Sequence, residues 1–289
     1  MSDPIIVGVD GSAPSDRALD WAADEAVRRG LELHIVHAQE TWPYSWPFDL
    51  PTSLVPGESA ARFDEAVRQM LTAAEERARQ GRPDLAVTTE LATQSAVEAL
   101  RERSEKASEV VVGHRGLGGF SSLLLGSVSL RVSERASAPV VIVRGDTFPE
   151  RREMAVGIDL VDDAPALEYA FQTAAVRGAR LRVVHAWHIP EWLLDSHKAI
   201  NLDELEEKAR WSVVEAHAPY RRRFPGVEVV EEVPRIHAVE GLVEASMEVD
   251  LLVVGRHGKS QRDHRLGSTC HGVVHHAHCP VAVVRQEPS

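Results

Sequence analysis

The stretch Val110–Ser129, VVVGHRGLGGFSSLLLGSVS, decides the fold, because it joins an apolar strand to a helix start through a glycine-rich loop. Three consecutive valines are typical of a strand buried on both faces of a parallel sheet. Comparable short apolar runs occur at Ile5–Val9, Leu33–Val36 and Val140–Val143. Helical patterns alternate with these runs, so the sequence predicts an α/β fold with a parallel sheet and helices on both faces.

The helices are legible from their apolar spacing. Leu19, Ala22, Ala23 and Ala26 follow the i, i+3, i+4, i+7 pattern of a core-facing helix side, and Gly30 is placed to end that helix. Residues 85–91 alternate between apolar and polar side chains, which predicts a less buried edge strand.

The chain repeats itself once. Four segments recur in the same order: Ile5–Asp10 as Met154–Asp159, Leu33–Ala38 as Leu181–Ala186, Val110–Gly113 as Leu252–Gly255, and Pro139–Arg144 as Pro280–Arg285. The polar segment Gly145–Glu153 separates the two copies and has the composition of a linker. We therefore predict two tandem domains, 1–146 and 152–289, each a flavodoxin-like or Rossmann-like domain with a five-stranded parallel sheet.

A spaced set of small residues follows the strand at 110–112. Gly113 and Gly116 are separated from Gly126-Ser127 in the pattern Gly-x2-Gly-x9-Gly-Ser. Glycines just past a strand let a ligand approach the backbone, and the free N–H groups at a helix start favour phosphate. The hydroxyls of Ser127 and Ser129 can add hydrogen bonds. Each residue alone is more often a turn or a cap, but together they favour a phosphate site.

Asp10 ends the first strand of the same half. A carboxylate there can accept a hydrogen bond from a base amino group or a ribose hydroxyl. The first strand and the strand before Gly113 flank the switch point of a doubly wound sheet, where ligands bind. Asp10 and the glycines are therefore expected to converge on one cleft.

With both copies and this spacing, the whole chain resembles a tandem universal stress protein of the actinobacterial, ATP-binding type. The resemblance implies bound ATP, with or without Mg²⁺. It also implies that the last strands, Pro139–Arg144 and Pro280–Arg285, pair across the two halves and leave other surfaces for a homodimer. It implies that Asp10 and Ala38 contact adenine and ribose. It implies phosphate and ribose contacts from Gly113, Gly116, Gly126, Ser127, Val128 and Ser129.

The second half departs from the motif. It has Gly-x2-Gly-x8-Gly-Ser, one residue shorter, and its loop is charged and bulky. The equivalent candidates are Asp159, Ala186, Gly255, Gly258, Gly267, Ser268 and Thr269. Asp162 and Asp163 add negative charge near the expected phosphates, while Lys259, Arg262 and Arg265 could compensate. A second nucleotide site and a degenerate, structural copy therefore both stay open.

Composition excludes some classes of protein. The formal net charge of −12 argues against a nucleic-acid partner, which requires a basic surface. Two cysteines are too few for a disulfide framework, so a reducing, cytoplasmic compartment is expected. No apolar run of about 18 residues is present, so no membrane span is expected.

The other histidines and an aromatic stretch are interpreted without a catalytic or metal-binding role. His271 and His275 have an i, i+4 spacing that can share a zinc ion, but no further ligand pattern completes a metal site, and an ordinary helix is favoured. His37 and His185 are expected to bond a backbone group rather than to act as bases. The aromatic stretch 42–48 is expected to form a lid or an interface.

Three functions compete. The first is an ATP-binding regulatory protein of the stress or dormancy response, with little or slow hydrolysis, working as a homodimer with an unidentified protein partner. The second is a Mg²⁺-dependent ATPase or nucleotide-transferring enzyme, although neither a Walker B-like carboxylate nor a base is recognisable. The third is a ligand-independent dimeric scaffold.

Overall fold

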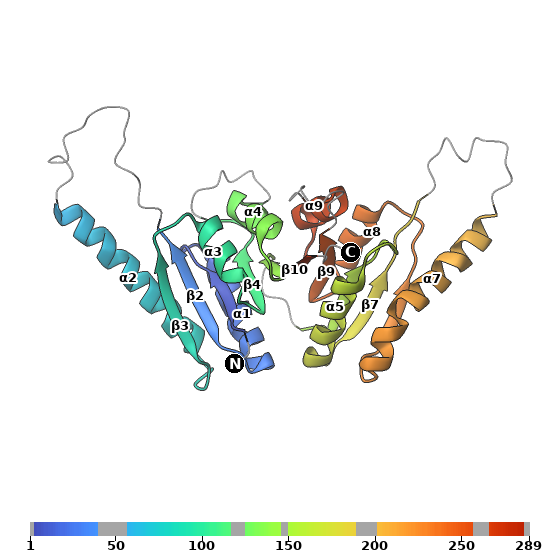
Figure 1. Ribbon diagram of the computed structural model, residues 1–289, viewed down its shortest axis with the longest axis horizontal. Coiled ribbons are helices and arrows are strands. Elements are labelled where there is room, and N and C mark those ends of the chain that lie inside the picture. Colours follow the sequence, from blue (N-terminus) through green and yellow to red (C-terminus); the bar gives the residue numbers. More distant parts are fainter. Residues whose placement is uncertain are drawn as a thin grey trace, which may run out of the picture. The chain divides into compact units, whose positions relative to one another are not determined.

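The computed structural model describes residues 3–39, 57–116, 125–145, 150–188, 201–256 and 266–285, and only the backbone of 57–64 (Figure 1). Contacts divide the chain into two units, Met1–Val132 with Ala136–Ala138, and Ser133–Arg135 with Pro139–Ser289. The tandem α/β architecture is thereby confirmed. The boundaries 1–146 and 152–289 stay a prediction.

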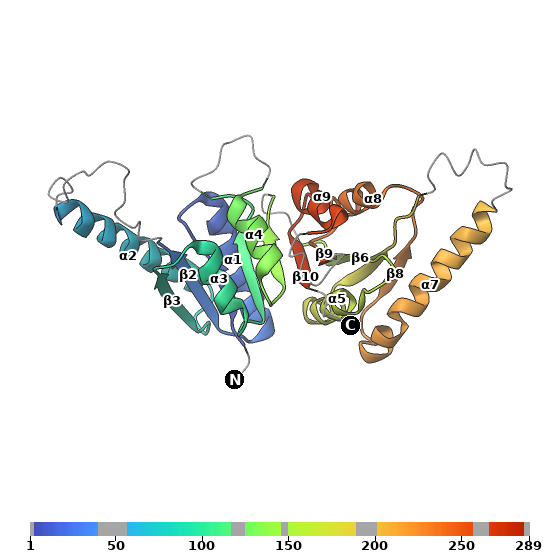
Figure 2. The ribbon, with the colours of Figure 1, turned by 45° about the horizontal axis from the view of Figure 1, so that its top comes forward.

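The first unit is built on a parallel sheet in the order β3-β2-β1-β4. Its strands are β1 (Ile5–Gly8), β2 (Leu33–Ala38), β3 (Val87–Ala92) and β4 (Glu109–Gly113). Its helices are α1 (Ala13–Arg29), α2 (Gly57–Arg79), α3 (Ala96–Ser104) and α4 (Ser127–Arg135), of which α4 reaches into the second unit. Helices α1 and α2 cover one face, and α3 and α4 the other (Figures 1 and 2).

The second unit repeats this order in β9-β6-β7-β8 and has two more strands, so that its full order is β5-β10-β9-β6-β7-β8. Its strands are β5 (Val140–Val143), β6 (Glu153–Gly157), β7 (Arg180–Val184), β8 (Val229–Glu232), β9 (Leu251–Arg256) and β10 (Val281–Arg285). Its helices are α5 (Ala164–Arg177), α7 (Leu202–Arg223), α8 (Ala238–Ala245) and α9 (Ser268–His276).

β5 is the last strand of the first half of the sequence, yet its contacts place it in the second unit. It pairs antiparallel with β10, with Val281 opposite Ile142 and Val283 opposite Val140. The pairing of the two last strands, expected from the resemblance, is therefore present. The remaining pairs of this sheet are parallel.

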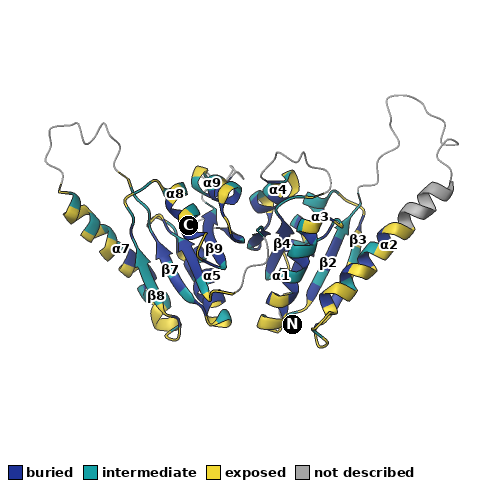
Figure 3. Ribbon diagram, turned by 180° about the vertical axis from the view of Figure 1, so that it is seen from behind, coloured by how far each residue is buried: buried dark blue, intermediate teal, exposed yellow. Residues whose placement is uncertain are grey.

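The cores follow the apolar patterns of the sequence. β4 and β5 are buried along their whole length, whereas β3 is buried only at its two end residues and lies at the sheet edge. The expected less buried edge strand is therefore present, although its burial does not alternate. Leu19, Ala22, Ala23 and Ala26 of α1 are fully buried. Figure 3 shows buried strands between helices whose outer sides are exposed.

Helix α1 is bounded by the residues that the sequence suggests. Ser12 caps its start by accepting a hydrogen bond from the Ser15 N–H at 3.3 Å. Gly30 ends it in the left-handed conformation (φ +64°), and its N–H bonds carbonyls of the last turn. This fixed start holds the loop after β1 in place.

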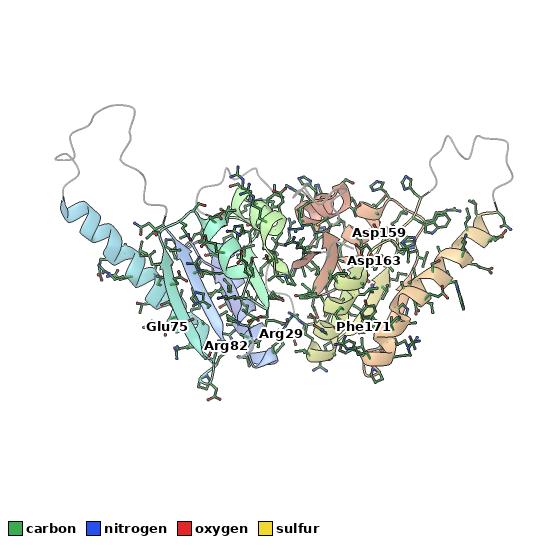
Figure 4. The ribbon with its side chains drawn as sticks, in the orientation of Figure 1. Arg29, Glu75, Arg82, Asp159, Asp163 and Phe171 are labelled. Atoms are coloured by element: carbon green, nitrogen blue, oxygen red, sulfur yellow. The ribbon has the colours of Figure 1, made fainter. Side chains whose placement is uncertain are left out.

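An ion-pair cluster joins α1 to the start of β4. The carboxylates of Glu25 and Glu109 are fully buried, and Arg29, which Figure 4 labels, bonds them at 2.6 Å and 3.2 Å. Arg28 lies 3.6 Å from the Glu25 carboxylate as well. The two guanidinium groups compensate carboxylates that would be costly to bury alone.

Within the part of the chain that the structure describes, no helix is both long and apolar enough to cross a membrane.

Candidate functional site

A cavity of about 430 Å³ opens at the carboxyl ends of β1 and β4, where the strand order reverses. It gathers all eight candidates of the first half: Asp10, Ala38, Gly113, Gly116, Gly126, Ser127, Val128 and Ser129. The convergence expected from the strand pattern is therefore what the structure has. Their contacts with a ligand stay a prediction.

The loop after β1 fixes Asp10. Gly11 takes the left-handed conformation (φ +78°), and the Ser12 N–H donates to Oδ1 of Asp10 at 3.0 Å. The Asp10 N–H lies 3.4 Å from Oγ of Ser15, whose hydroxyl donates to the Ser12 carbonyl at 2.9 Å. Backbone groups thus hold the carboxylate in the cavity wall.

Gly113, the last residue of β4, and Gly116, which follows the strand, leave room for different neighbours. A Cβ at Gly113 would lie 2.7 Å from the carbonyl carbon and oxygen of Pro14, so this glycine lets the first turn of α1 pack closely. A Cβ at Gly116 would fall far inside the contact distance of Oδ2 of Asp10. The first glycine serves the packing of the unit, and the second gives the Asp10 carboxylate its place.

Helix α4 points its start at the cavity. Gly126 is its N-cap, no side chain caps it, and Ser127, Val128 and Ser129 line the cavity. N–H groups in a first helical turn have no acceptor within the helix, and the helix dipole favours an anion there. The arrangement suits a phosphate group.

Two hydrogen bonds tie this helix start to β4. The Gly126 N–H donates to the His114 carbonyl at 2.7 Å, and the Ser129 hydroxyl donates to the Gly113 carbonyl at 2.6 Å. Ser129 is therefore also a structural residue, which its position in the motif alone does not reveal. The ligand contact predicted for Ser129 would then use its backbone N–H or a lone pair of its hydroxyl oxygen.

The opposite wall is mostly apolar and was largely missed in the sequence. Val36, Ala96, Leu100 and Val112 line it beside Ala38. Aliphatic side chains of this kind suit the flat faces of a base. Their sequence signal is only that of ordinary core positions, so spacing could not single them out.

Two further side chains enter the cavity wall. They are Arg115, which is the arginine among the described lining residues, and His37.

His37 and its counterpart in the second unit, His185, each bond a backbone carbonyl. Nδ1 of His37 is 2.8 Å from the Val9 carbonyl, and Nδ1 of His185 is 3.1 Å from the Ile158 carbonyl. Since a carbonyl only accepts, each Nδ1 carries the proton, and both rings satisfy a backbone group as expected.

The second unit has a different loop after its first strand (Figure 4). The buried carboxylate of Asp163 accepts from the N–H groups of Asp159 at 3.1 Å and Leu160 at 2.7 Å. Oδ1 of Asp159 accepts from the Val161 N–H at 2.9 Å. Leu160 has φ +67°, the conformation that Gly11 takes in the first unit. A carboxylate thus replaces the Ser15 hydroxyl.

The structure describes only some of the remaining candidate residues of the second unit. Gly255 lies in β9, Gly267 is the N-cap of α9, and Ser268 and Thr269 begin that helix. Ala186 lies after β7, with its Cβ 3.0 Å from the Cβ position of Gly241. Gly258, Lys259, Arg262 and Arg265 lie outside the described residues, as does the aromatic stretch 42–48.

Two histidine rings of α9 lie close together in a tilted arrangement. The ring centroids of His271 and His275 are 4.5 Å apart. Burial, followed by the charges of His271 and His276, holds the pKa of His275 below its usual value. Among the residues described, no three His, Cys, Asp or Glu side chains gather in a group that could hold a metal ion.

Comparison with known proteins decides the family. The family model described as "Universal stress protein family" matches residues 1–144 and 150–285, one match for each copy. The chain belongs to the universal stress protein family. The two matches also make it a tandem member of that family, as the sequence predicted.

Relatives of this universal stress protein match it over nearly their whole length. One from Mycolicibacterium smegmatis is 34% identical, over 97% of this chain and 96% of its own. Another, from Mycobacterium tuberculosis, is 37% identical over 98% and 96%. A crystal structure of a universal stress protein from Archaeoglobus fulgidus shares the fold, with a TM-score of 0.68, 20% identity, and coverage of 99% of this chain and 97% of its own.

Proposed function

We propose that this universal stress protein binds ATP in the cavity of its first unit and acts as a regulatory protein of the stress response. The observation that carries the proposal is the joint presence, around one cavity, of a helix start without a side-chain cap, two glycines at the end of β4 and the Asp10 carboxylate. The phosphates lie against Gly126–Ser129, and the base lies on the apolar wall beside Ala38.

The same geometry favours binding over rapid hydrolysis. Phosphoryl transfer needs a metal ion, charge at the γ-phosphate and an oriented nucleophile. Of the described residues that line the cavity, Asp10 is the carboxylate and Arg115 the cation. The Asp10 carboxylate already accepts a backbone hydrogen bond. Mg²⁺ then enters with the nucleotide, and turnover is slow.

The remaining assignments belong to the same proposal. The protein works in the cytoplasm as a homodimer, and its domains extend over 1–146 and 152–289. In the second unit, the buried Asp163 carboxylate brings negative charge to the loop that would face phosphates. We therefore assign the nucleotide to the first unit and a structural role to the second motif.

Calorimetric titration of the full chain with ATP tests the proposal, in the presence and in the absence of Mg²⁺. Saturable binding, accompanied by phosphate release far slower than one event per second, is the expected result; enzymes commonly reach about 1–1,000 per second. Heat no larger than dilution at millimolar ATP would remove ATP from the account. Rapid, Mg²⁺-dependent phosphate release would favour an ATPase instead.

A further inference from the structure

The long helix α7 carries an apolar patch on its exposed side. Its buried residues are Val213 and His217, and it packs against α5 and β8. Away from these contacts, Trp211 is 64% exposed and Val214 is 39% exposed. Figure 3 shows the outer side of α7 exposed along the helix.

Helix α2 of the first unit is the natural comparison, because the two units are copies. Its buried Val67 and Leu71 have the same four-residue spacing as Val213 and His217. Each pair marks buried positions near the middle of its helix. Aligning the two pairs superimposes the outward positions of the two helices.

In that alignment, Trp211 corresponds to Glu65 and Val214 to Arg68. Glu65 and Arg68 form an exposed ion pair at 3.6 Å, with side chains 58% and 68% exposed. In this alignment the first copy has charged side chains at the two outward positions where the second copy has a tryptophan and a valine. Exposed apolar side chains of this size are costly to leave in water.

The patch continues along the helix with coiled-coil spacing. Steps of 3, 4, 3, 4 and 3 residues connect Glu204, Glu207, Trp211, Val214, Ala218 and Arg221. Such alternating steps keep side chains on one seam that faces a second helix. The seam is acidic at its start, apolar in its middle and basic at its end.

The charges and apolar residues of the seam match one another when two copies of the helix lie antiparallel. Glu204 and Arg221 lie at equal distances from the helix midpoint, between residues 212 and 213, and so do Trp211 and Val214. Two antiparallel copies would place Glu204 against Arg221, and Trp211 against Val214, in both directions. A parallel pair would instead oppose like charges at each end.

We propose that this face of α7 binds α7 of a second copy of the chain in an antiparallel, two-fold symmetric pair. The Trp211 and Val214 side chains supply the buried apolar centre, and the terminal charge pairs set direction and register. One helix pair falls short of the ~1,600 Å² that standard interfaces bury, so the association is weak and depends on concentration.

Charge reversal tests the pairing, with sedimentation equilibrium of the full chain as the readout. Glu204→Arg and Arg221→Glu each oppose like charges and should weaken self-association about tenfold. The double variant should restore it, and an equimolar mixture of the two single variants should form a heterodimer. Glu65→Arg on α2 is the matched control, expected to behave as the wild type.

Circular dichroism checks that each variant is folded, which is expected because the altered side chains are exposed. Single variants that associate as strongly as the wild type would overturn the proposal, since another face would hold the copies together. A wild type that stays monomeric at about 100 μM, well above the ~1 μM of a moderate complex, would overturn it too.

Discussion

Oδ2 of Asp10 occupies the space that a Cβ atom on residue 116 would need. Asp10 follows β1 and Gly116 follows β4, so this close approach brings together the segments after the two strand ends that flank the cavity. A glycine at this position is therefore a condition for the placement of the carboxylate, in addition to any freedom it gives the loop.

The variant Gly116→Ala should disturb the site without unfolding the protein. The added Cβ meets the end of the Asp10 side chain, which can rotate away, so stability changes little. The displaced carboxylate should lower ATP affinity at least about tenfold, which equals ~1.4 kcal/mol. Calorimetry measures the affinity and thermal denaturation the stability.

Gly226→Ala is the matched control, because a Cβ there meets nothing within 4 Å and no left-handed φ is required. It should leave both affinity and stability unchanged. Equal ATP affinities of the Gly116→Ala and Gly226→Ala variants would contradict the assigned role of Asp10.

Gly113→Ala should act through packing instead. Its Cβ would lie 2.7 Å from backbone atoms of Pro14, which cannot rotate away as a side chain can. Overpacking of this kind costs about 1–3 kcal/mol. A clearly lowered midpoint of thermal unfolding is expected. A variant as stable as the wild type would show that α1 can shift away from β4 at little cost.

The fold and the outline of the site could be predicted from the sequence. Apolar strands, amphipathic helices and Gly30 at a helix end are local signals, and they predicted the elements because each follows from its own residues. The glycine spacing with Asp10 predicted which strand ends meet. The remaining features depend on contacts between distant residues or on the exact backbone path of a loop, which local patterns do not encode.

Three features illustrate this limit. The bond from the Ser129 hydroxyl to the Gly113 carbonyl joins residues 16 positions apart and gives a predicted ligand residue a structural role. The inward turn of Asp163 depends on the local backbone path of its loop. The ion pair of Arg29 with Glu109 spans 80 positions.

That last contact leads to a stability prediction. Arg29→Met would leave the buried carboxylates of Glu25 and Glu109 without the guanidinium that bonds both. Breaking a buried pair typically costs about 3–5 kcal/mol, so a loss of this size is expected in the free energy of unfolding. Urea denaturation measures it.

Arg68→Met provides the comparison, because the ion pair of Arg68 with Glu65 is exposed and typically worth less than about 1 kcal/mol. Equal losses of unfolding free energy in the two variants would show that the buried cluster stabilises the fold no more than an exposed ion pair does.

Lowering the pH should reduce the stability that the ionised Glu90 carboxylate gives the first unit. Hydrogen bonds from Arg103 lower the pKa of Glu90 from 4.5 to about 2, with a smaller contribution from His34. A carboxyl with a lowered pKa in the folded state adds stability above its unfolded pKa and loses it as the pH falls toward the folded value. Glu90→Gln should therefore be less stable than the wild type at neutral pH.

The difference in unfolding free energy between wild type and Glu90→Gln should shrink between about pH 5 and about pH 3. Urea denaturation at several pH values within this window measures it. A difference that stays constant across the window would mean that the Glu90 charge adds nothing to folding.

Native mass spectrometry of the full chain, with ATP near the Kd of the wild type, tests the assigned site because it counts the nucleotides bound to each chain. At most one ATP per chain is expected, on about half of the wild-type chains and on roughly a tenth or fewer of the Gly116→Ala chains. The same number of nucleotides on both proteins, or no nucleotide on either, would contradict the assignment of this cavity as the ATP site.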